Sequence, residues 1–109
     1  MITRTEKIRT LNDELRQHLL GGVAVMTPGV AALGPDIVDR IIKTISVYAN
    51  FCQDNDPYEE HDFGMFETEG NKIMFKIDYY DKDMQYHSPD PSDPDVTERV
   101  LTIMLAEEY

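Results

Sequence analysis

The segment that most constrains the fold is "KIMFKIDYYD" (residues 72–81), in which apolar and polar side chains alternate. A period of two places the apolar set on one face of a strand and the polar set on the other, as in a half-buried antiparallel strand. The apolar set is Ile73, Phe75, Ile77 and Tyr79. The preceding "EGN" (residues 69–71) contains a glycine suited to the positive φ of a tight turn. We therefore expect a β-hairpin whose first strand covers residues 62–68, with Tyr79 facing the core.

Two amphipathic helices are predicted before the hairpin. The first begins at the capping pair Thr3 and Glu6 and ends at Gly21. The second begins after Gly34, with Pro35 at its first helical position. Apolar residues at helical spacing give each helix one buried face. They are Ile8, Leu11, Leu15 and Leu19 in the first helix, and Ile37, Ile41, Ile45 and Tyr48 in the second.

Two further elements are predicted from local signals. The segment "VAVMT" (residues 23–27) is apolar and contains β-branched residues, so we expect a short buried strand. The segment "HSPDPSDPD" (residues 87–95) contains three prolines and is predicted to be a loop. Asp93 as N-cap and Pro94 at the next position then predict a last helix. Its apolar face is expected to be Val96, Val100, Ile103 and Met104.

The predicted order is helix, strand, helix, strand, strand, helix, within a single domain covering residues 1–109. No repeat or low-complexity linker divides the chain, and 41% of its residues are hydrophobic, enough for one modest core. Such an order favours the α+β class. We expect a small antiparallel sheet of about three strands with the helices packed on one face.

The charge of the chain is unevenly distributed. Its formal net charge is −11, made of 6 basic against 5 acidic residues (+1) over residues 1–50 and 4 against 16 (−12) over residues 51–109. A net charge of this sign repels phosphates, so direct binding of nucleic acid is not expected. It attracts basic surfaces, which favours a basic protein partner. The alternative is that the acidity serves solubility alone.

The location of the protein is inferred from what the sequence lacks. The first residues have no apolar signal-peptide core, and the single Cys52 cannot form an intramolecular disulfide. No apolar run approaches the ~20 residues that span a bilayer. We therefore expect a cytoplasmic protein with no membrane contact, and the oligomeric state stays open.

Metal binding is tested first at "NDPYEEHDFG" (residues 55–64), where carboxylates and a histidine crowd together. Zinc sites use His and Cys ligands at fixed spacings, whereas the three histidines of this chain are scattered. A calcium loop starting at Asp54 would have Tyr58 at a ligand position, Glu59 at the glycine position and Met65 at the bidentate Glu position. The pattern fails, and we predict no metal site and no cofactor.

An acid–base site is a second reading of the same stretch. Glu60, His61 and Asp62 lie at the start of one hairpin strand, while Asp78 and Asp81 lie near the end of the other, so these groups are expected to meet. Neighbouring carboxylates raise one another's pKa and adjust that of a histidine. The alternative is that Asp62 and Asp81 bind local backbone N–H groups. No nucleophile–base pair or catalytic motif occurs, so we predict no catalytic residue and expect a non-enzymatic protein.

An acidic binding surface is the third reading, and it lies further along the chain. Tyrosines and a proline-rich loop lose little conformational entropy on docking, and carboxylates between them would oppose Lys and Arg side chains. The predicted surface is Asp78, Tyr80, Asp81, Asp83, Tyr86, Asp90, Asp93 and Asp95.

Several segments together resemble a known family. They are "LNDELR", "VMTPGVAAL", "EHDFG", "KIDYYD", "SPDPSDPD" and "RVLTIMLAEEY". With these segments the chain is similar to domain-of-unknown-function family 3768, small bacterial proteins often encoded on plasmids and phages. The resemblance supplies no catalytic residue, but it implies a setting of mobile DNA, where small acidic proteins antagonise host defence.

The expected function therefore combines the charge with this resemblance. We expect an acidic interaction protein that docks on a basic surface of a nucleic-acid-binding defence complex, of the anti-CRISPR or anti-restriction type. The alternative is a small enzyme or ligand-binding domain with its site at His61, Asp62, Asp78 and Asp81.

Overall fold

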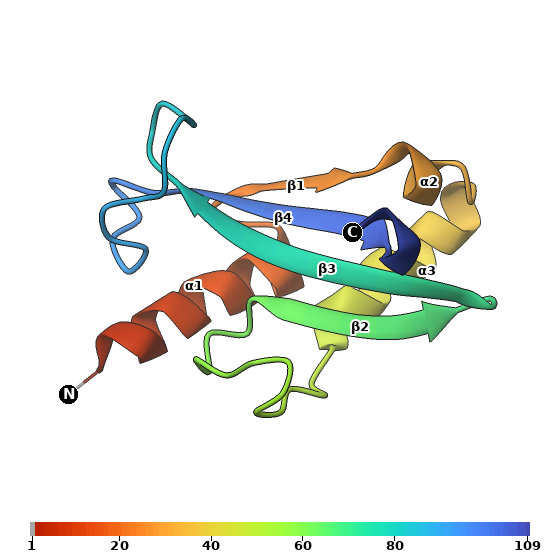
Figure 1. The fold of residues 1–109 in the computed structure, drawn as a ribbon, viewed down its shortest axis with the longest axis horizontal. Helices are drawn as coiled ribbons and strands as arrows, with labels where there is room; N and C mark the ends of the chain where they lie inside the picture. The colour runs from red at the N-terminus through yellow and green to blue at the C-terminus, as the bar shows by residue number, and fades with distance from the viewer. Residues whose placement is uncertain (1) are drawn as a thin grey trace.

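The computed structural model describes residues 2–109, which form a four-stranded mixed sheet with two long helices on one face (Figure 1). Along the sheet the strand order is β1-β4-β3-β2, with β1 parallel to β4 and the other pairs antiparallel. The predicted α+β class is confirmed. The elements are α1 (Arg4–His18), β1 (Val23–Met26), α2 (Pro28–Ala31), α3 (Pro35–Val47), β2 (Phe63–Thr68), β3 (Asn71–Tyr80), β4 (Glu98–Leu105) and the 3-10 helix η1 (Ala106–Glu108).

Both predicted long helices are confirmed, with their N-terminal signals. Thr3 Oγ1 accepts a hydrogen bond from the Glu6 amide at 3.1 Å, which satisfies one of the free N–H groups at the start of α1. Pro35 occupies the first turn of α3. Proline lacks an N–H group, which costs nothing there because the N–H groups of the first turn have no acceptor within the helix. The two helices pack against each other on the same side of the sheet.

The predicted hairpin is also confirmed. β2 and β3 pair antiparallel from Phe63 opposite Lys76 to Thr68 opposite Asn71. Ile77 and Tyr79 are buried beneath the helices, as the period of two predicts.

The predicted last helix is wrong, because residues 98–105 form β4. This strand lies in the middle of the sheet, between β1 and β3. Arg99, Leu101, Ile103 and Leu105 lie opposite Tyr79, Ile77, Phe75 and Ile73 of β3. A short run that is apolar on both faces fits either a buried helix or a central strand. Here the run forms a strand, because β1 and β3 offer backbone hydrogen-bond partners on both of its sides.

The segment 23–27 forms the expected strand, but the prediction that it is buried is wrong. All four residues of β1 are exposed. β1 is an edge strand with β4 as its single neighbour, and α1 and α3 lie nearer the middle of the sheet (Figure 1). Its parallel pairing with β4 also makes the sheet mixed, whereas an antiparallel sheet was expected.

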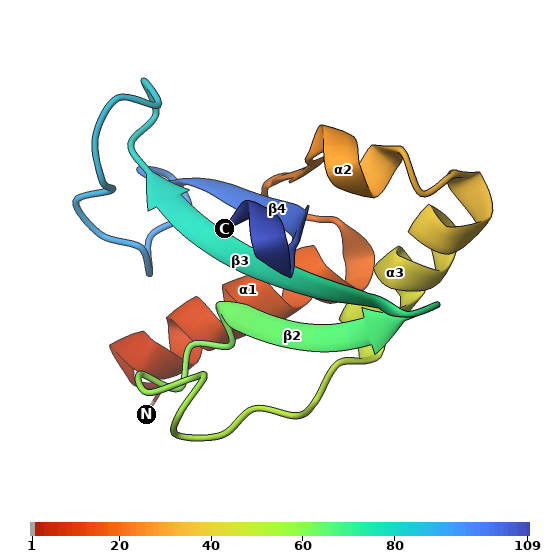
Figure 2. The same cartoon turned by 45° about the vertical axis from the view of Figure 1, so that its right-hand side comes forward.

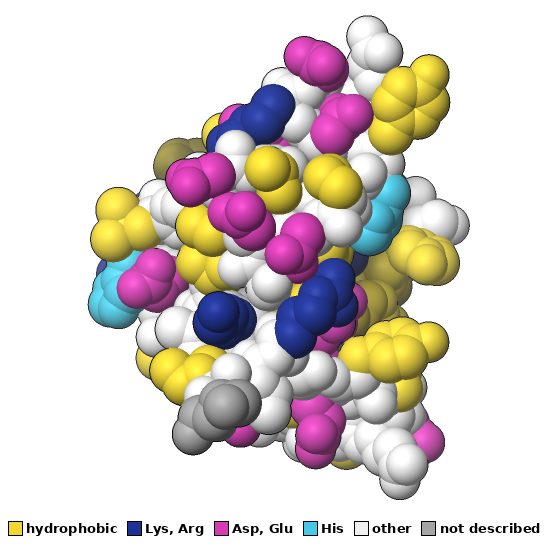
Figure 3. All heavy atoms as spheres, turned by 90° about the vertical axis from the view of Figure 1, so that its left-hand side faces the viewer, with side chains coloured by type: hydrophobic (Ala, Val, Ile, Leu, Met, Phe, Trp, Pro, Cys, Tyr) yellow, Lys and Arg dark blue, Asp and Glu magenta, His cyan; other side chains and the backbone are white. Residues whose placement is uncertain are grey.

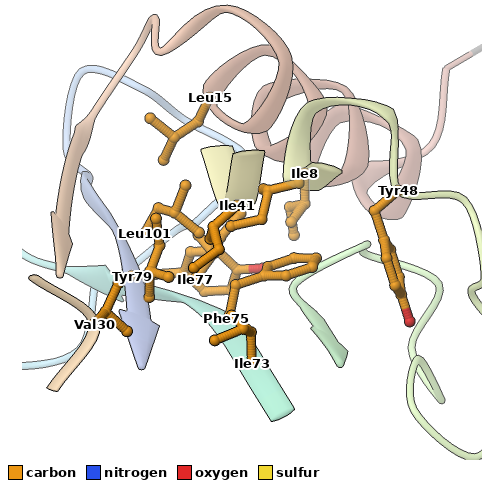
Figure 4. Packing of buried hydrophobic residues seen from close by; sticks show 12 residues of the cluster. Ile8, Leu15, Val30, Ile41, Tyr48, Ile73, Phe75, Ile77, Tyr79 and Leu101 are labelled. Atoms are coloured by element: carbon orange, nitrogen blue, oxygen red, sulfur yellow. The ribbon is translucent and has the colours of Figure 1, made fainter. Parts of the chain in front are cut away.

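The core lies between the sheet and the two long helices (Figure 4). Ile8 and Leu15 from α1 and Ile41 from α3 pack toward the side chains of β3 and β4. Gly64 allows the Phe75 ring to approach β2, because a Cβ on residue 64 would lie 2.4 Å from that ring. On the opposite face of the sheet, η1 folds against β3 (Figure 2).

No helix within residues 2–109 is both long enough and apolar enough to span a bilayer.

Candidate functional site

Asn12 is the centre of a buried polar network between α1 and the sheet. Its side chain is fully buried and uses both of its polar atoms. Asn12 Nδ2 donates to the Glu60 carbonyl at 2.9 Å and to Tyr79 Oη at 2.8 Å, and Asn12 Oδ1 accepts from Arg99 Nε at 2.7 Å. Tyr79 Oη in turn donates to Glu60 Oε1 at 2.8 Å. One amide therefore joins α1, the loop before β2, β3 and β4.

Arg99 brings a positive charge into this network with 1% of its surface exposed. Its guanidinium lies 5.0 Å from the centre of the Tyr79 ring and donates to the Pro91 carbonyl. No carboxylate within residues 2–109 forms an ion pair with it. Burial lowers the pKa of Arg99, against the opposing effects of Tyr79 and Glu60. Neutral acceptors and an aromatic face thus hold a desolvated cation.

Burial also acts on Tyr79, the aromatic partner of Arg99. It raises the pKa of the Tyr79 hydroxyl well above its ordinary value, and the hydrogen bond to Glu60 acts in the same direction. Tyr79 is therefore a neutral donor to Glu60, and it does not supply a base.

His61 belongs to a second group of polar contacts, next to the first. His61 Nδ1 lies 2.9 Å from Asp13 Oδ1, and its ring stacks on Phe51 with the ring centres 3.9 Å apart. The same Asp13 oxygen accepts from Arg16 at 2.8 Å. Arg16 also donates to the Ile45 and Tyr48 carbonyls at 2.7 and 3.0 Å, so it satisfies free carbonyls at the end of α3.

The backbone of the segment 55–64 is held by Asp56. Asp56 Oδ1 accepts from the amides of Glu60 and His61, both at 3.0 Å. Glu59 and His61 have φ values of 58°, in the left-handed region that side chains adopt rarely. A buried carboxylate that binds two amides compensates for such a backbone. The acidic stretch is therefore a structured turn before β2.

Asp62 is a further titratable group of this region whose acidity is strongly altered. Its pKa is raised from 3.8 to about 6, chiefly by burial and then by the negative charge of Glu60, with smaller effects from Asp56 and Asp78. Asp62 also continues the β2–β3 pairing, since its carbonyl accepts from the Ile77 amide at 2.8 Å. The structure thus brings Asp62 close to Asp78, as the sequence predicted.

A polar hollow of about 600 Å³ opens beside His61. Its walls include Arg9, Phe51, Cys52, Asp56 and Glu59. Two of these residues are joined, since Arg9 donates to the Glu59 carbonyl at 3.0 Å. Within the described part of the chain, no three His, Cys, Asp or Glu side chains are arranged to hold a metal ion. The hollow has the size of a small-ligand site.

Asp81 lies apart from His61 and Asp62, at the start of the long loop between β3 and β4 (residues 81–97). Asp81 Oδ1 accepts from the amides of Gln85 and Tyr86, at 3.0 and 3.4 Å, so it caps a local turn. This matches the backbone-binding alternative for Asp81. The structure therefore brings Asp62 near Glu60 and Asp78, whereas the His61 ring contacts Asp13 and Phe51 and Asp81 lies in the loop.

The other carboxylates of the predicted binding surface divide into bonded and free groups. Asp90 accepts from the amide and hydroxyl of Ser92 and pairs with Arg4 at 3.3 Å, and the Ser92 bonds lower its pKa. Asp93 accepts from the Asp95 amide at 2.9 Å. Asp78 pairs with Lys76 at 3.0 Å.

Three of the predicted surface residues are exposed to solvent. They are Asp83, Tyr86 and Asp95. Tyr80, by contrast, is half-buried at the end of β3, where it lies opposite Glu98. Figure 3 faces this end of the molecule and shows acidic side chains gathered over its upper part, with Lys and Arg among them.

Two central residues of the site, Asn12 and Arg99, were missed by sequence reasoning. Asn12 is a single polar residue on a helix, and nothing near it in the sequence indicates its partners. Arg99 falls within the predicted last helix, which the structure replaces with β4. Its alternation with Leu101, Ile103 and Leu105 was an available signal that it faces the same side as the core.

Comparison with known proteins identifies the family. The chain belongs to the family described as "Protein of unknown function (DUF3768)", which matches residues 26–108. No curated protein and no solved structure matches the chain. The family match includes β4 and the β3–β4 loop, while Asn12 lies outside it.

The first prediction concerns the Asn12–Arg99 contact. Asn12→Leu keeps the size of the side chain but leaves the Arg99 Nε–H and the Glu60 carbonyl without their partner. We expect it to lower the free energy of unfolding by about 2–4 kcal/mol, measured by urea denaturation. The matched control is Gln17→Leu, an exposed amide on the same helix, for which we expect a change within about 0.5 kcal/mol.

A double variant separates the contact from general damage to α1. In Asn12→Leu/Arg99→Met both the acceptor and the buried charge are gone, so part of the lost stability should return. Equal stability of Asn12→Leu and Gln17→Leu would show that the network does not hold the fold together.

The second prediction concerns Asp62. Because its folded-state pKa lies above the ordinary value, this group stabilises the fold most below about pH 4 and loses that contribution as the pH rises through about 6. Asp62→Asn should therefore be more stable than the wild type at pH 7.5, by about 1–2 kcal/mol after allowance for solvent screening. The difference should vanish near pH 3.5.

Urea denaturation at several pH values measures this difference. Asp54→Asn makes the same chemical change at an exposed position and separates loss of charge from relief of burial. A stability difference for Asp62→Asn that is the same at pH 3.5 and 7.5 would contradict the assignment.

Proposed function

We propose that the protein is an acidic interaction domain that binds a basic protein surface through its β3–β4 loop. The observation that carries this proposal is the placement of charge. Residues 51–109 hold 16 acidic against 4 basic residues, and within the loop Asp83, Tyr86 and Asp95 are all exposed to solvent. An exposed tyrosine offers contact area to a partner, and exposed carboxylates can pair with its Lys and Arg side chains.

The loop is ordered by its own hydrogen bonds, which favours binding. The Asp81 amide donates to the Tyr86 carbonyl at 2.8 Å, and the Ser88 amide donates to the Tyr79 carbonyl at 3.0 Å. The hydroxyls of Ser88 and Thr97 lie 2.7 Å apart in the interior of the loop. A loop that is already ordered loses little conformational entropy when it docks.

The partner that fits this surface is a protein that normally binds nucleic acid. Such proteins carry Lys and Arg clusters spaced for phosphates, and exposed carboxylates on an ordered loop would occupy the same cluster. With the setting that the family resemblance implies, we propose an antagonist of a CRISPR or restriction complex that acts by occlusion.

The internal contacts of the His61 region support an interaction protein over an enzyme. Asp13, Glu60 and Tyr79 each have a partner within the chain. Their polar atoms are thus engaged in holding elements together.

The third prediction tests the loop by charge reversal. In Asp83→Lys/Asp95→Lys the formal net charge changes by +4, and both side chains are exposed, so the melting temperature should stay nearly unchanged. Tagged protein is used to capture partners from the lysate of a host with active CRISPR and restriction systems, at low and high salt. The wild type should capture one nucleic-acid-binding complex at low salt. The variant should bind that complex at least about tenfold more weakly, a loss of ~1.4 kcal/mol.

The matched control is Glu14→Lys/Glu67→Lys, which changes the charge equally at exposed positions outside the loop. It should retain capture, and purified wild-type protein should inhibit DNA cleavage by the captured complex. Recovery of the wild type alone at both salt concentrations would contradict the proposal, and so would equal loss of binding in the control.

A small-ligand or acid–base site is the second candidate, favoured by the 600 Å³ hollow beside His61 and by the raised pKa of Asp62.

The fourth prediction is that small polar compounds shift the amide NMR signals of Arg9, Cys52 and His61 together. The Asp83→Lys/Asp95→Lys variant should show the same shifts, because the loop is not involved. Absence of such shifts across a broad fragment set would remove this candidate.

A further inference from the structure

The free edge of β1 lies in the longest uncharged stretch of the chain. Residues 19–35 contain no Asp, Glu, Lys or Arg, although such residues make up 28% of the protein. This stretch runs from the end of α1 through β1 and α2 (Figure 1). The proposed function does not use it.

The same stretch exposes large apolar side chains. Leu20 is 59% exposed, Leu19 52% and Val23 50%, and Val25 and Met26 are also exposed. These residues lie within eight consecutive positions of the sequence. Beside them is a mostly apolar hollow of about 160 Å³, lined in part by Leu19, Met26 and Ile42. Contiguous exposed apolar surface of this kind marks an interaction site.

The conformation of Leu19 adds an independent observation. Leu19 ends α1 in the left-handed conformation, with φ 56°, a position where glycine or asparagine is usual. A leucine in this conformation strains the backbone, and its exposure leaves an apolar side chain in contact with water. Such a residue points to a function for the side chain outside its own monomer.

The backbone of β1 is ready to pair on its free side. Thr27 donates its amide to the Ile103 carbonyl of β4, and amides alternate in direction along a strand. The amides of Ala24 and Met26 therefore point away from β4. β1 contains no charge, proline or bulge that would block another strand, whereas the opposite edge strand, β2, carries the exposed Glu67.

From these observations we propose that a second copy of this chain pairs its β1 antiparallel with the β1 edge, which gives a two-fold symmetric dimer with a continuous eight-stranded sheet. A two-fold contact must be self-complementary, and β1 meets this requirement because its outward amides, those of Ala24 and Met26, lie symmetrically about Val25. Two chains of net charge −11 repel each other over most of their surfaces, and the uncharged stretch lets them approach without opposing carboxylates. Glu108, near the end of β1, binds its own chain, accepting from Thr27 Oγ1 at 2.6 Å.

The register of the pairing follows from the outward amides. A two-fold axis through Val25 places Ala24 opposite Met26 of the second copy, so both outward amides find acceptors. Val25 then faces its counterpart as a pair without backbone hydrogen bonds, in which side chains are closest. An interface centred on four residues lies below the ~1,200 Å² of a standard complex, so the dimer should depend on concentration.

The fifth prediction is tested by sedimentation of the purified chain from low to high micromolar concentration. The apparent mass should rise toward twice the 12.5 kDa of the monomer. Val25→Lys and Val25→Glu should each stay monomeric, because like charges would meet at the axis. An equimolar mixture of the two variants should dimerise again, which a merely misfolded variant could not do. Val47→Lys adds the same charge at an exposed residue of α3 and should dimerise like the wild type.

Two results would overturn the inference. One is a wild type that stays monomeric at every concentration. The other is a dimer that persists in both Val25 variants, which would place the contact elsewhere. Amide hydrogen exchange gives the local readout, since Ala24 and Met26 should gain protection when the wild type dimerises and not in Val25→Lys.

Discussion

The contact on which the rest of the structure depends is the hydrogen bond from Arg99 to Asn12. It lies where α1 crosses the sheet, and both side chains are buried. A cation without an ion pair is stable there because neutral oxygens and the Tyr79 ring surround it. If α1 were displaced, Arg99 would lose its acceptor, and a buried donor without a partner is costly. The position of the helix on the sheet is thus specified by polar geometry as well as by apolar packing.

This network also holds both loops at one end of the molecule. Asn12 binds the Glu60 carbonyl in the loop before β2, and Arg99 binds the Pro91 carbonyl in the loop after β3. The acidic residues of the two loops are therefore carried by segments attached to the same buried pair. Along the far edge of the sheet, β1 carries no charge. The protein thus has an acidic end and an uncharged edge.

The parts of the fold that were predictable from sequence are those set by local signals. The hairpin has a clean period of two and a glycine turn, and α1 and α3 have their capping residues. β4 has a weaker local signal, because its residues are apolar on both faces, and its neighbours β1 and β3 come from distant parts of the chain; the alternation that begins at Arg99 does not by itself separate a strand from a helix. The exposure of β1 depends on strand order, which its own four residues do not encode. Likewise, Asp62 was identified as a candidate from its neighbours, whereas the partners of His61 include Asp13, 48 residues away.

The position of β4 has a consequence for folding during synthesis. The central strand of the sheet is the last strand in sequence, so β1 has no pairing partner and β3 lacks one neighbour until residues 98–105 have left the ribosome. Until then the nascent chain presents an unpaired apolar β1 next to a β2–β3 hairpin with one open side. Long-range pairing of this kind slows folding and leaves strand edges open to other chains. The exposed edges of β1 and β3 are therefore closed together, in one step, when residues 98–105 enter the sheet between them.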